Sequence, residues 1–282
     1  MEKDRLGLLY AIAAVFFFST SAVLVRFSAP LSTYQISCGR LVVGSAAILL
    51  LGSLRREHRW PARSDWPRFI VYGAITAAHF VFYVAAILYT TLAHALTLVY
   101  TAPIWVALLS AWRLKEPLRP RQYAGMLVTL AGLGVMVGFE PQMSRQMIIG
   151  DLLALASAVM FALYTIAGRS QRQRYPLFTY AGLVYGLAAL WLAPLAAATT
   201  HSVPGWPQVL AVIGLGLIPM AAGHTLYNAA VRHTHAAYAN LIATQEVTGG
   251  VLLGILLLGE VPGPTTVIGL AVTLAGIALV LR

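Results

Sequence analysis

The sequence predicts an all-α integral membrane protein in which ten transmembrane helices form two inverted five-helix repeats. Three observations lead to this prediction. The chain is 59% hydrophobic and 10% charged, with a mean hydropathy of +0.78, whereas a water-soluble domain of this size would need more polar surface. Its apolar runs have the length of a bilayer crossing, and one long unit of sequence occurs twice.

The duplication is clearest near the end of each half. Residues 125–133 read GMLVTLAGL and residues 269–277 read GLAVTLAGI, so the five residues VTLAG return at a spacing of 144 residues. A period this long indicates a domain-sized duplication rather than a short solenoid repeat. We therefore divide the chain into a first repeat, residues 1–144, and a second repeat, residues 145–282. Other equivalent pairs, with one residue of slippage early in the repeat, are Gly7 and Gly150, Phe18 and Phe161, Tyr83 and Tyr227, Thr90 and Thr234, and Glu116 and Glu260.

Ten apolar runs are close to the roughly 20 residues that a membrane helix requires. They show no period-2 alternation, and only helices satisfy their backbone in lipid without closing a barrel, so we expect a helical bundle. Five spans per repeat is an odd number, so the second copy must cross the membrane in the opposite sense. The expected spans are residues 7–26, 33–53, 67–89, 93–113, 121–138, 150–168, 178–199, 208–231, 236–258 and 265–281.

The basic residues predict the orientation of these spans. Of the 19 Lys and Arg residues, sixteen lie in loops or chain ends on the side of the N-terminus, and only Arg26 and Arg145 lie on the other side. The remaining one, Arg40, falls within the second span. Because cytoplasmic loops carry the excess of Lys and Arg, both termini are expected in the cytoplasm. This topology also explains the net charge of +10, so nucleic-acid binding is not expected.

Charged residues at membrane depth are candidates for function, because each costs about 2.5–3.5 kcal/mol at mid-span. Glu246 lies near the middle of the ninth span, between Gln245 and Thr248. We interpret it either as a packing acid that hydrogen-bonds a neighbouring helix or as a contact for substrate or proton. Arg40 lies two turns in from the outer end of its span, where snorkelling or ion pairing would explain it.

Histidine and aromatic residues form the second group of candidates. His79 and Tyr83 are four apart on one helix face, and Tyr227 is the repeat equivalent of Tyr83. Such symmetry-related groups are expected at a midplane site, although hydrogen bonding between helices is the structural alternative. In the functional interpretation, the Tyr rings enclose an apolar side chain, while His79, the hydroxyls and Glu246 meet charged ends. The predicted substrate-binding residues are His79, Tyr83, Tyr100, Tyr164, Tyr227 and Glu246.

Several classes of chemistry lack support in the sequence. The single cysteine, Cys38, has no partner for a disulfide or a soft metal site. The His-x-His at 233–235 lies at a helix end without a nearby carboxylate or cysteine and is a weak zinc signal. A membrane-embedded enzyme would need paired carboxylates or a nucleophile with its base, and one mid-membrane acid is not a pair. We therefore expect no catalytic residue, no metal and no cofactor.

The order of features in each repeat is also informative. A helix that ends in an acid and is followed by a Gly-rich span occurs at residues 101–132, where it contains Pro103, and again at residues 254–276. In this the chain resembles the EamA-type, ten-helix branch of the drug/metabolite transporter superfamily over essentially its whole length. The second copy departs from the pattern with Val247 at the position of Pro103. The first span also lacks the acid that couples drug to proton in small multidrug relatives.

The resemblance implies a multi-pass exporter of the bacterial inner membrane that works by alternating access between its repeats. The chain looks most like exporters of aromatic and other neutral amino acids. Efflux of cationic drugs and carriage of nucleotide sugars or sugar phosphates are the alternatives, and the latter would want several Lys or Arg residues in the cavity, where Arg40 stands alone. Its partners would be a small-molecule substrate and membrane lipid. Because the duplication already supplies the inverted partner, we expect a monomer.

Cysteine labelling tests the predicted topology. A cysteine introduced by Gln142→Cys or by His201→Cys should react with an impermeant reagent in intact cells, because both positions fall in expected outer loops. Protection of either position in intact cells, with free labelling after lysis, would contradict the orientation.

Overall fold

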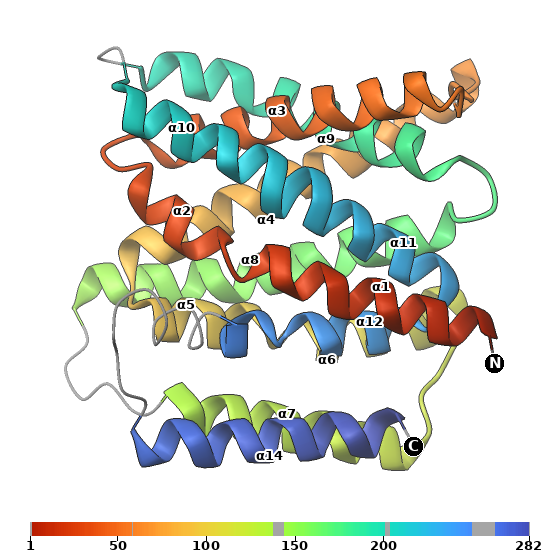
Figure 1. Cartoon of the computed structure of the whole chain (residues 1–282), viewed down its shortest axis with the longest axis vertical. Helices are drawn as coiled ribbons and strands as arrows, with labels where there is room; N and C mark the ends of the chain where they lie inside the picture. The colour runs from red at the N-terminus through yellow and green to blue at the C-terminus, as the bar shows by residue number, and fades with distance from the viewer. Residues whose placement is uncertain (1, 58, 138–143, 201–203, 250–262, 282) are drawn as a thin grey trace.

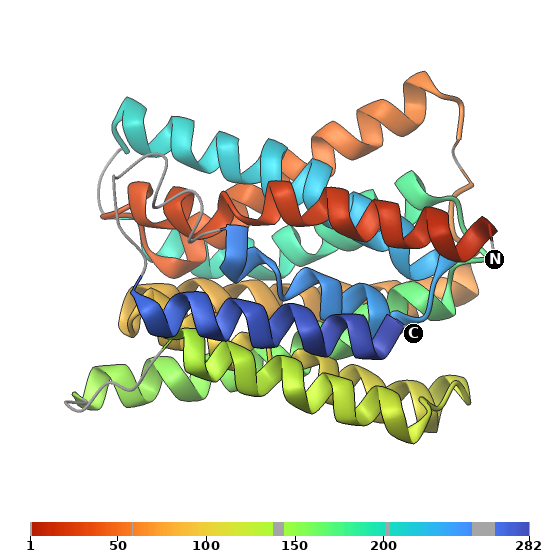
Figure 2. The same ribbon diagram turned by 60° about the horizontal axis from the view of Figure 1, so that its bottom comes forward.

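The computed structural model describes residues 2–57, 59–137, 144–200, 204–249 and 263–281, and this part of the chain is a bundle of helices without strands (Figure 1). Seven of its helices are long and apolar enough to cross a membrane, and a shorter apolar helix covers Val267–Leu281. The all-helical membrane fold is therefore confirmed at this level. The helices run along one common direction, and the two chain ends lie at the same end of the bundle (Figures 1 and 2).

Six of the expected spans are continuous helices in the described part of the chain. Equivalent spans of the two sequence copies pack along each other, since α3 lies along α9 and α7 lies along α14. Two other neighbouring pairs, α4 with α8 and α1 with α11, are also related by exchange of the copies. The continuous helices are α3 (Thr33–Leu54), α4 (Trp66–Tyr89), α7 (Pro120–Val137), α8 (Arg145–Ser170), α9 (Leu177–Ala198) and α14 (Pro264–Leu281).

Three other expected spans, residues 7–26, 93–113 and 236–258, contain a break in the regular α-helix, although the first and the fourth are still long and apolar enough to cross a membrane. The first consists of α1 (Glu2–Phe18) and α2 (Ser21–Phe27), and the fourth of α5 (Leu92–Val99), α6 (Ala102–Leu109) and the π-helical η2 (Ser110–Leu114). The ninth begins with α12 (Ala236–Ala243) and is helical again at 246–249; its continuation over 250–258 lies outside the described residues. The breaks at 100–101 and 244–245 are equivalent positions of the two copies.

Each interruption contains a threonine that bonds the carbonyl three residues before it. The hydroxyl of Thr20 donates to the Phe17 carbonyl at 2.8 Å, that of Thr101 to Leu98 at 2.8 Å, and that of Thr244 to Leu241 at 2.6 Å. The backbone N–H of each threonine donates to the same carbonyl. A threonine hydroxyl thus replaces part of the helical ladder, which lets the chain turn inside the bundle without an unsatisfied carbonyl.

The eighth expected span is also irregular. It comprises α10 (Trp206–Leu215), a π-helical segment η3 (Gly216–His224) and α11 (Thr225–His233). Pro219 lies within η3 and has no N–H for the α-helical bond to the residue four before it, which accounts for a local change of hydrogen-bond register. Pro103 has a different effect, because it stands in the first turn of α6, where a missing N–H costs nothing.

The repeated VTLAG segments meet each other across the α7–α14 contact. A Cβ placed on Gly132 would lie 2.5 Å from the backbone nitrogen of Thr273, and a Cβ on Gly276 would collide with the backbone nitrogen of Thr129. These two contacts are related by exchange of the copies. The glycines let the two helix backbones approach, as small residues do in membrane helix pairs. Figure 1 shows this pair as a layer beside the other helices.

Further contacts are reciprocal in the same way. The guanidinium of Arg26 donates to the carbonyl of Ile87 at 3.3 Å, and the equivalent Arg169 donates to the carbonyl of Val231, the equivalent of Ile87, at 2.9 Å. A Cβ on Gly7 would lie 2.8 Å from the Cβ of Thr234, and one on Gly150 would lie 2.9 Å from the Cβ of Thr90. Corresponding residues therefore occupy corresponding environments in the two halves.

Two alanine substitutions on one helix test the α7–α14 packing. Gly132→Ala should destabilise the protein by about 1–3 kcal/mol, because the added methyl group meets backbone atoms that cannot move aside cheaply. Gly134→Ala is the matched control, since a Cβ there has no described atom within 4 Å. This substitution also replaces glycine, a poor helix former, with alanine. Unfolding in mixed detergent and SDS micelles measures both, and equal effects would contradict the proposed close contact.

Candidate functional site

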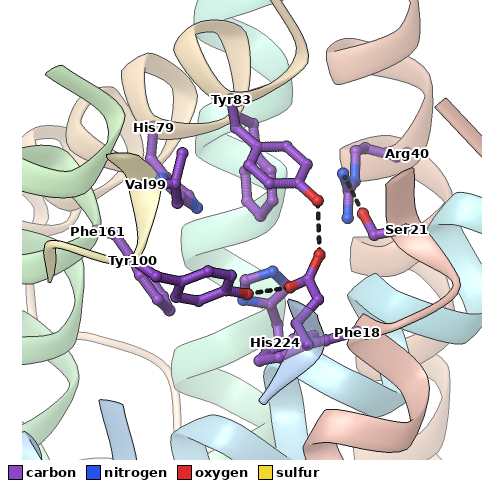
Figure 3. A pocket seen from close by; sticks show the side chains of 11 residues that line it. Phe18, Ser21, Arg40, His79, Tyr83, Val99, Tyr100, Phe161 and His224 are labelled. Carbon is purple, nitrogen blue, oxygen red and sulfur yellow. Dashed lines mark hydrogen bonds between the residues drawn. The ribbon is translucent and has the colours of Figure 1, made fainter. Parts of the chain in front are cut away.

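A small pocket lies among the interrupted helices (Figure 3). Its cavity volume is about 20 Å³, which is room for about one water molecule. Its walls are aromatic for the most part, with an acid, a guanidinium and two imidazoles among them. The lining residues are Phe18, Ser21, Arg40, His79, Phe80, Tyr83, Val99, Tyr100, Phe161, His224 and Glu246.

The irregular points of the helices supply half of this lining. Phe18 and Ser21 flank the break in the first span, and Val99 and Tyr100 stand at the break in the fourth. Glu246 follows the break in the ninth span directly, and His224 is the last residue of the π-helical η3. Broken membrane helices place backbone and side chains at a binding site in many transporters. In this protein, the interruptions of the first, fourth and ninth spans all border the same pocket.

The carboxylate of Glu246 is held by two tyrosine hydroxyls. Tyr83 donates to its Oε1 at 2.8 Å, and Tyr100 donates to its Oε2. Figure 3 shows both bonds meeting at the one carboxylate. Glu246 is 5% exposed, and one hydroxyl donor on each oxygen suits an ionised carboxylate, which can only accept. Donors from α4 and from the break after α5 therefore stabilise this buried acid.

Arg40 turns into the pocket instead of reaching the surface. Its side chain is 1% exposed, so neither snorkelling nor surface pairing describes it. Nη1 donates to the Ser21 hydroxyl at 3.4 Å, and the guanidinium carbon lies 4.6 Å from the centre of the Phe80 ring. Within the described part of the chain, its Nε has no hydrogen-bond partner. The pocket thus contains a buried positive charge that is only partly satisfied by its surroundings.

Imidazole and aromatic rings form the rest of the wall. His79 stacks on Phe161 with 4.8 Å between ring centres, and its Nδ1 lies 2.9 Å from the Ser157 hydroxyl. His224 meets the edge of Phe80 with 5.0 Å between ring centres, and no described residue hydrogen-bonds its buried Nδ1. This surface combines ring faces with polar atoms, which suits a ligand with an apolar part and a few hydrogen-bonding groups.

Four of the six predicted site residues meet at this pocket, namely His79, Tyr83, Tyr100 and Glu246. Tyr164 and Tyr227 do not line it. The Tyr164 hydroxyl accepts a bond from Asn228, and the Tyr227 hydroxyl bonds Thr165 at 2.7 Å and Asn240 at 2.9 Å. Both rings lie beside Phe161, at 6.1 and 5.2 Å between centres, so they support the wall from behind.

The remaining lining residues are absent from the predicted set. Phe18 and Phe161 are equivalent in the two copies, and that symmetry could have indicated them as site residues. The position of Arg40 within its span could also have indicated a site residue, but snorkelling or ion pairing was the interpretation chosen for it. Ser21 and Val99 line the pocket only because their helices break, and hydrophobic periodicity does not report such breaks.

A group of ion pairs lies at the end of the bundle that carries both chain ends. The Glu116 carboxylate receives bidentate bonds from Arg169, at 3.1 and 3.2 Å, and a bond from Arg172 at 3.4 Å. Arg169 also donates to the Thr234 carbonyl at 2.7 Å, while His235 Nε2 lies 2.9 Å from the Glu116 carbonyl. These bonds connect the end of η2 with α8 and with the segment before α12.

The described residues hold no group of three or more His, Cys, Asp or Glu side chains that could bind a metal ion. His94 and Asp151 lie 3.1 Å apart, but they form only a pair.

A sequence model of the EamA-like transporter family matches residues 5–138 and 148–282. The chain belongs to this family. The family and the relatives named below are transporters, so this protein is a membrane transporter, and the resemblance of its sequence to the drug/metabolite transporter superfamily is confirmed.

The relatives cover most of the chain. The aromatic amino acid exporter YddG of Ancylobacter novellus is 29% identical over 222 residues, 75% of each chain. The "Probable terminal-alkyne amino-acid exporter" of Streptantibioticus cattleyicolor is 26% identical over 253 residues, 88% of this chain and 83% of the relative. The uncharacterized transporter YwfM of Bacillus subtilis is 26% identical over 286 residues, 99% of this chain and 94% of the relative. A solved crystal structure shares the fold with a TM-score of 0.82 over 97% of this chain and 95% of its own, at 23% identity.

His235, outside the membrane-spanning segments, predicts a dependence of stability on pH. Burial lowers the pKa of its ring, and the contact with the Glu116 carbonyl only partly opposes this. Its Nδ1 accepts the N–H of Ala237 at 3.1 Å, which requires the neutral ring. The stabilisation is therefore complete above the pKa of an unfolded histidine, about 6.5, and is lost as pH falls toward the lower folded value.

Thermal unfolding in detergent at pH 7.5 and pH 5 measures this effect. His235→Thr is the matched variant, because Thr91 caps α5 at the equivalent position of the first copy. The variant should lose less stability on acidification than the unmodified protein. Equal losses would mean that other groups cause the acid sensitivity.

Proposed function

We propose that this transporter exports aromatic and other neutral amino acids across the bacterial inner membrane, by alternating access between two inverted repeats. The observation that carries the proposal is the Glu246 carboxylate, which two tyrosine hydroxyls hold inside an aromatic pocket at the breaks of three helices. In this arrangement the carboxylate meets the substrate's ammonium group, and the rings of Tyr100, Phe161 and Phe18 enclose its apolar side chain.

The reciprocal contacts support inverted repeats. When equivalent residues of two sequence copies exchange roles, as Gly132 with Thr273 and Gly276 with Thr129 do, a pseudo-two-fold axis relates the halves. Such an axis in the membrane plane is the usual architecture of secondary transporters. Ten spans with both termini in the cytoplasm agree with the two chain ends at one end of the bundle (Figure 1). Both copies are in one chain, so a monomer suffices.

The size of the pocket supports a moving mechanism. A cavity of about 20 Å³ does not hold an amino acid, so its walls must separate for substrate to enter. The helix breaks around the pocket provide the points at which helix halves can shift. Opening toward the basic end requires the pairs between Glu116 and the arginines Arg169 and Arg172 to separate.

The amino-acid class rests on relatives and on the pocket together. The Ancylobacter and Streptantibioticus proteins are named as amino acid exporters. Phosphorylated sugars would need more than one basic group in the cavity, and among the described lining residues Arg40 is the one arginine or lysine. Cationic drugs would fit the acid and the rings, but they would face the Arg40 charge.

Reconstitution into liposomes tests this function with a screen over amino acids, phosphorylated sugars and quaternary ammonium cations. Glu246→Gln should reduce transport of neutral amino acids at least about tenfold, because a charge-assisted bond to the ammonium group is lost. Tyr83→Phe should reduce it severalfold through the loss of one donor to the acid. Tyr89→Phe on the same helix is the control, since Tyr89 is 41% exposed and outside the pocket.

Unchanged amino acid transport by folded Glu246→Gln protein would remove the site, and transport of phosphorylated sugars alone would remove the substrate class. A pH gradient imposed in the same assay distinguishes passive from proton-coupled export.

A further inference from the structure

We propose that Arg40 binds the carboxylate of the substrate while Glu246 binds its ammonium group, so that the pocket selects zwitterions. This inference rests on the proposed function and narrows it to free α-amino acids, whose two opposite charges lie close together. Arg40 then determines specificity together with Glu246, instead of stabilising the fold alone.

The surroundings of Arg40 are poor for a buried guanidinium. The group is charged at any physiological pH and offers five N–H donors. In the part of the chain that the structure describes, it makes one long bond to Ser21 at 3.4 Å and faces the Phe80 ring, and its Nε has no partner. Among the described residues, no carboxylate lies within 4.0 Å of it. Buried charges are normally paired and hydrogen-bonded, so a ligand anion would complete this site.

The nearest candidate partner within the protein is already engaged. Glu246 lines the same pocket, but its two oxygens accept from Tyr83 and Tyr100, not from Arg40. Two opposite charges thus face one cavity without forming an ion pair. A carboxylate placed at Arg40 and an ammonium placed at Glu246 would each gain a charged partner in one binding event.

The charge balance of the pocket selects among ligands. One guanidinium and one carboxylate sum to zero, so a zwitterion enters without leaving a buried charge unpaired. A cation would pair with Glu246 but leave Arg40 unpaired beside it, and a phosphate dianion would add negative charge next to Glu246. Both are costly in a site with little water.

The positions of the rings agree with this orientation. Figure 3 shows Arg40 and Ser21 on one side of the pocket and His79, Tyr100 and Phe161 on the other. A substrate whose charged end lies between Arg40 and Glu246 would direct its side chain toward these rings. His224 lies against Phe18 and Phe80 and also against Phe161, and its buried Nδ1 has no hydrogen-bond partner among the described residues, so it is a further polar group between the two sides.

Substrate analogues separate the two contacts. The assay is counterflow of L-phenylalanine in proteoliposomes, with L-phenylalaninamide and N-acetyl-L-phenylalanine as competitors. The amide lacks the carboxylate and the acetylated compound lacks the ammonium group. The unmodified protein should prefer L-phenylalanine to each analogue by about tenfold or more, the size expected for a lost charge-assisted bond.

The variants assign each preference to a residue. Arg40→Gln should weaken L-phenylalanine and abolish its advantage over the amide, while the advantage over N-acetyl-L-phenylalanine remains. Glu246→Gln should do the reverse, and Arg40→Lys should restore part of the carboxylate preference. Arg145→Gln, at an exposed arginine of α8, is the control for loss of a positive charge. Monodispersity and thermal unfolding in detergent show which variants fold.

Two results would overturn the inference. One is competition by L-phenylalaninamide within about twofold of L-phenylalanine in the unmodified protein, a measurement that needs no variant to fold. The other is an equal weakening of L-phenylalanine and its amide by Arg40→Gln, which would make Arg40 structural. Absence of any L-phenylalanine counterflow in the unmodified protein would instead contradict the proposed function.

Discussion

A backbone carbonyl that is released from a helix inside a membrane has no water to bind, and the architecture of this protein depends on how that requirement is met. Three helices break where a threonine hydroxyl and its own N–H share the carbonyl three residues before. The breaks therefore leave these carbonyls hydrogen-bonded, whereas an unsatisfied group in lipid would cost several kcal/mol. Since the breaks lie around one pocket, the same local bonds that satisfy the backbone also create the space in which polar side chains gather.

The pocket extends this principle from backbone to side chains. Glu246 and Arg40 lie where neither lipid nor bulk water can solvate them, and their stability depends on tyrosine hydroxyls, a serine and a ring face. Each oxygen of the acid accepts from one hydroxyl and keeps room for a further donor such as an ammonium group, whereas most N–H donors of the guanidinium face no acceptor among the described residues. Both groups are thus held in place by the protein and can still bind a ligand.

The sequence was sufficient for the helical membrane fold, the family and four residues of the pocket. Length and hydropathy are properties of whole spans, and the VTLAG repeat relates whole halves of the chain. Predictions from these properties therefore hold even when a span boundary is wrong by a few residues. The breaks at 19–20, 100–101 and 244–245 could not be predicted in this way, because hydropathy is averaged over whole spans and a threonine that bonds a preceding carbonyl also occurs at Thr76 inside the continuous helix α4. For Tyr164 and Tyr227, the sequence indicated the right part of the bundle but not the direction of the side chains. Their depth and symmetry indicated the right region, but the rotation of each helix directs their hydroxyls to Asn228 and Thr165.

The contact between α7 and α14 has a consequence for how the two copies can change. Each copy brings the same glycine and the same threonine to the same place, so the contact is isologous, like the interface of a two-fold symmetric dimer. A five-helix chain carrying VTLAG could form this contact with a second molecule of itself. In this chain, a residue larger than the glycine of one copy must be matched by a residue smaller than the threonine that faces it in the other copy. Independent substitutions in the two copies are thus most restricted at the α7–α14 contact. This restriction gives a physical reason why the five residues VTLAG are identical in both copies.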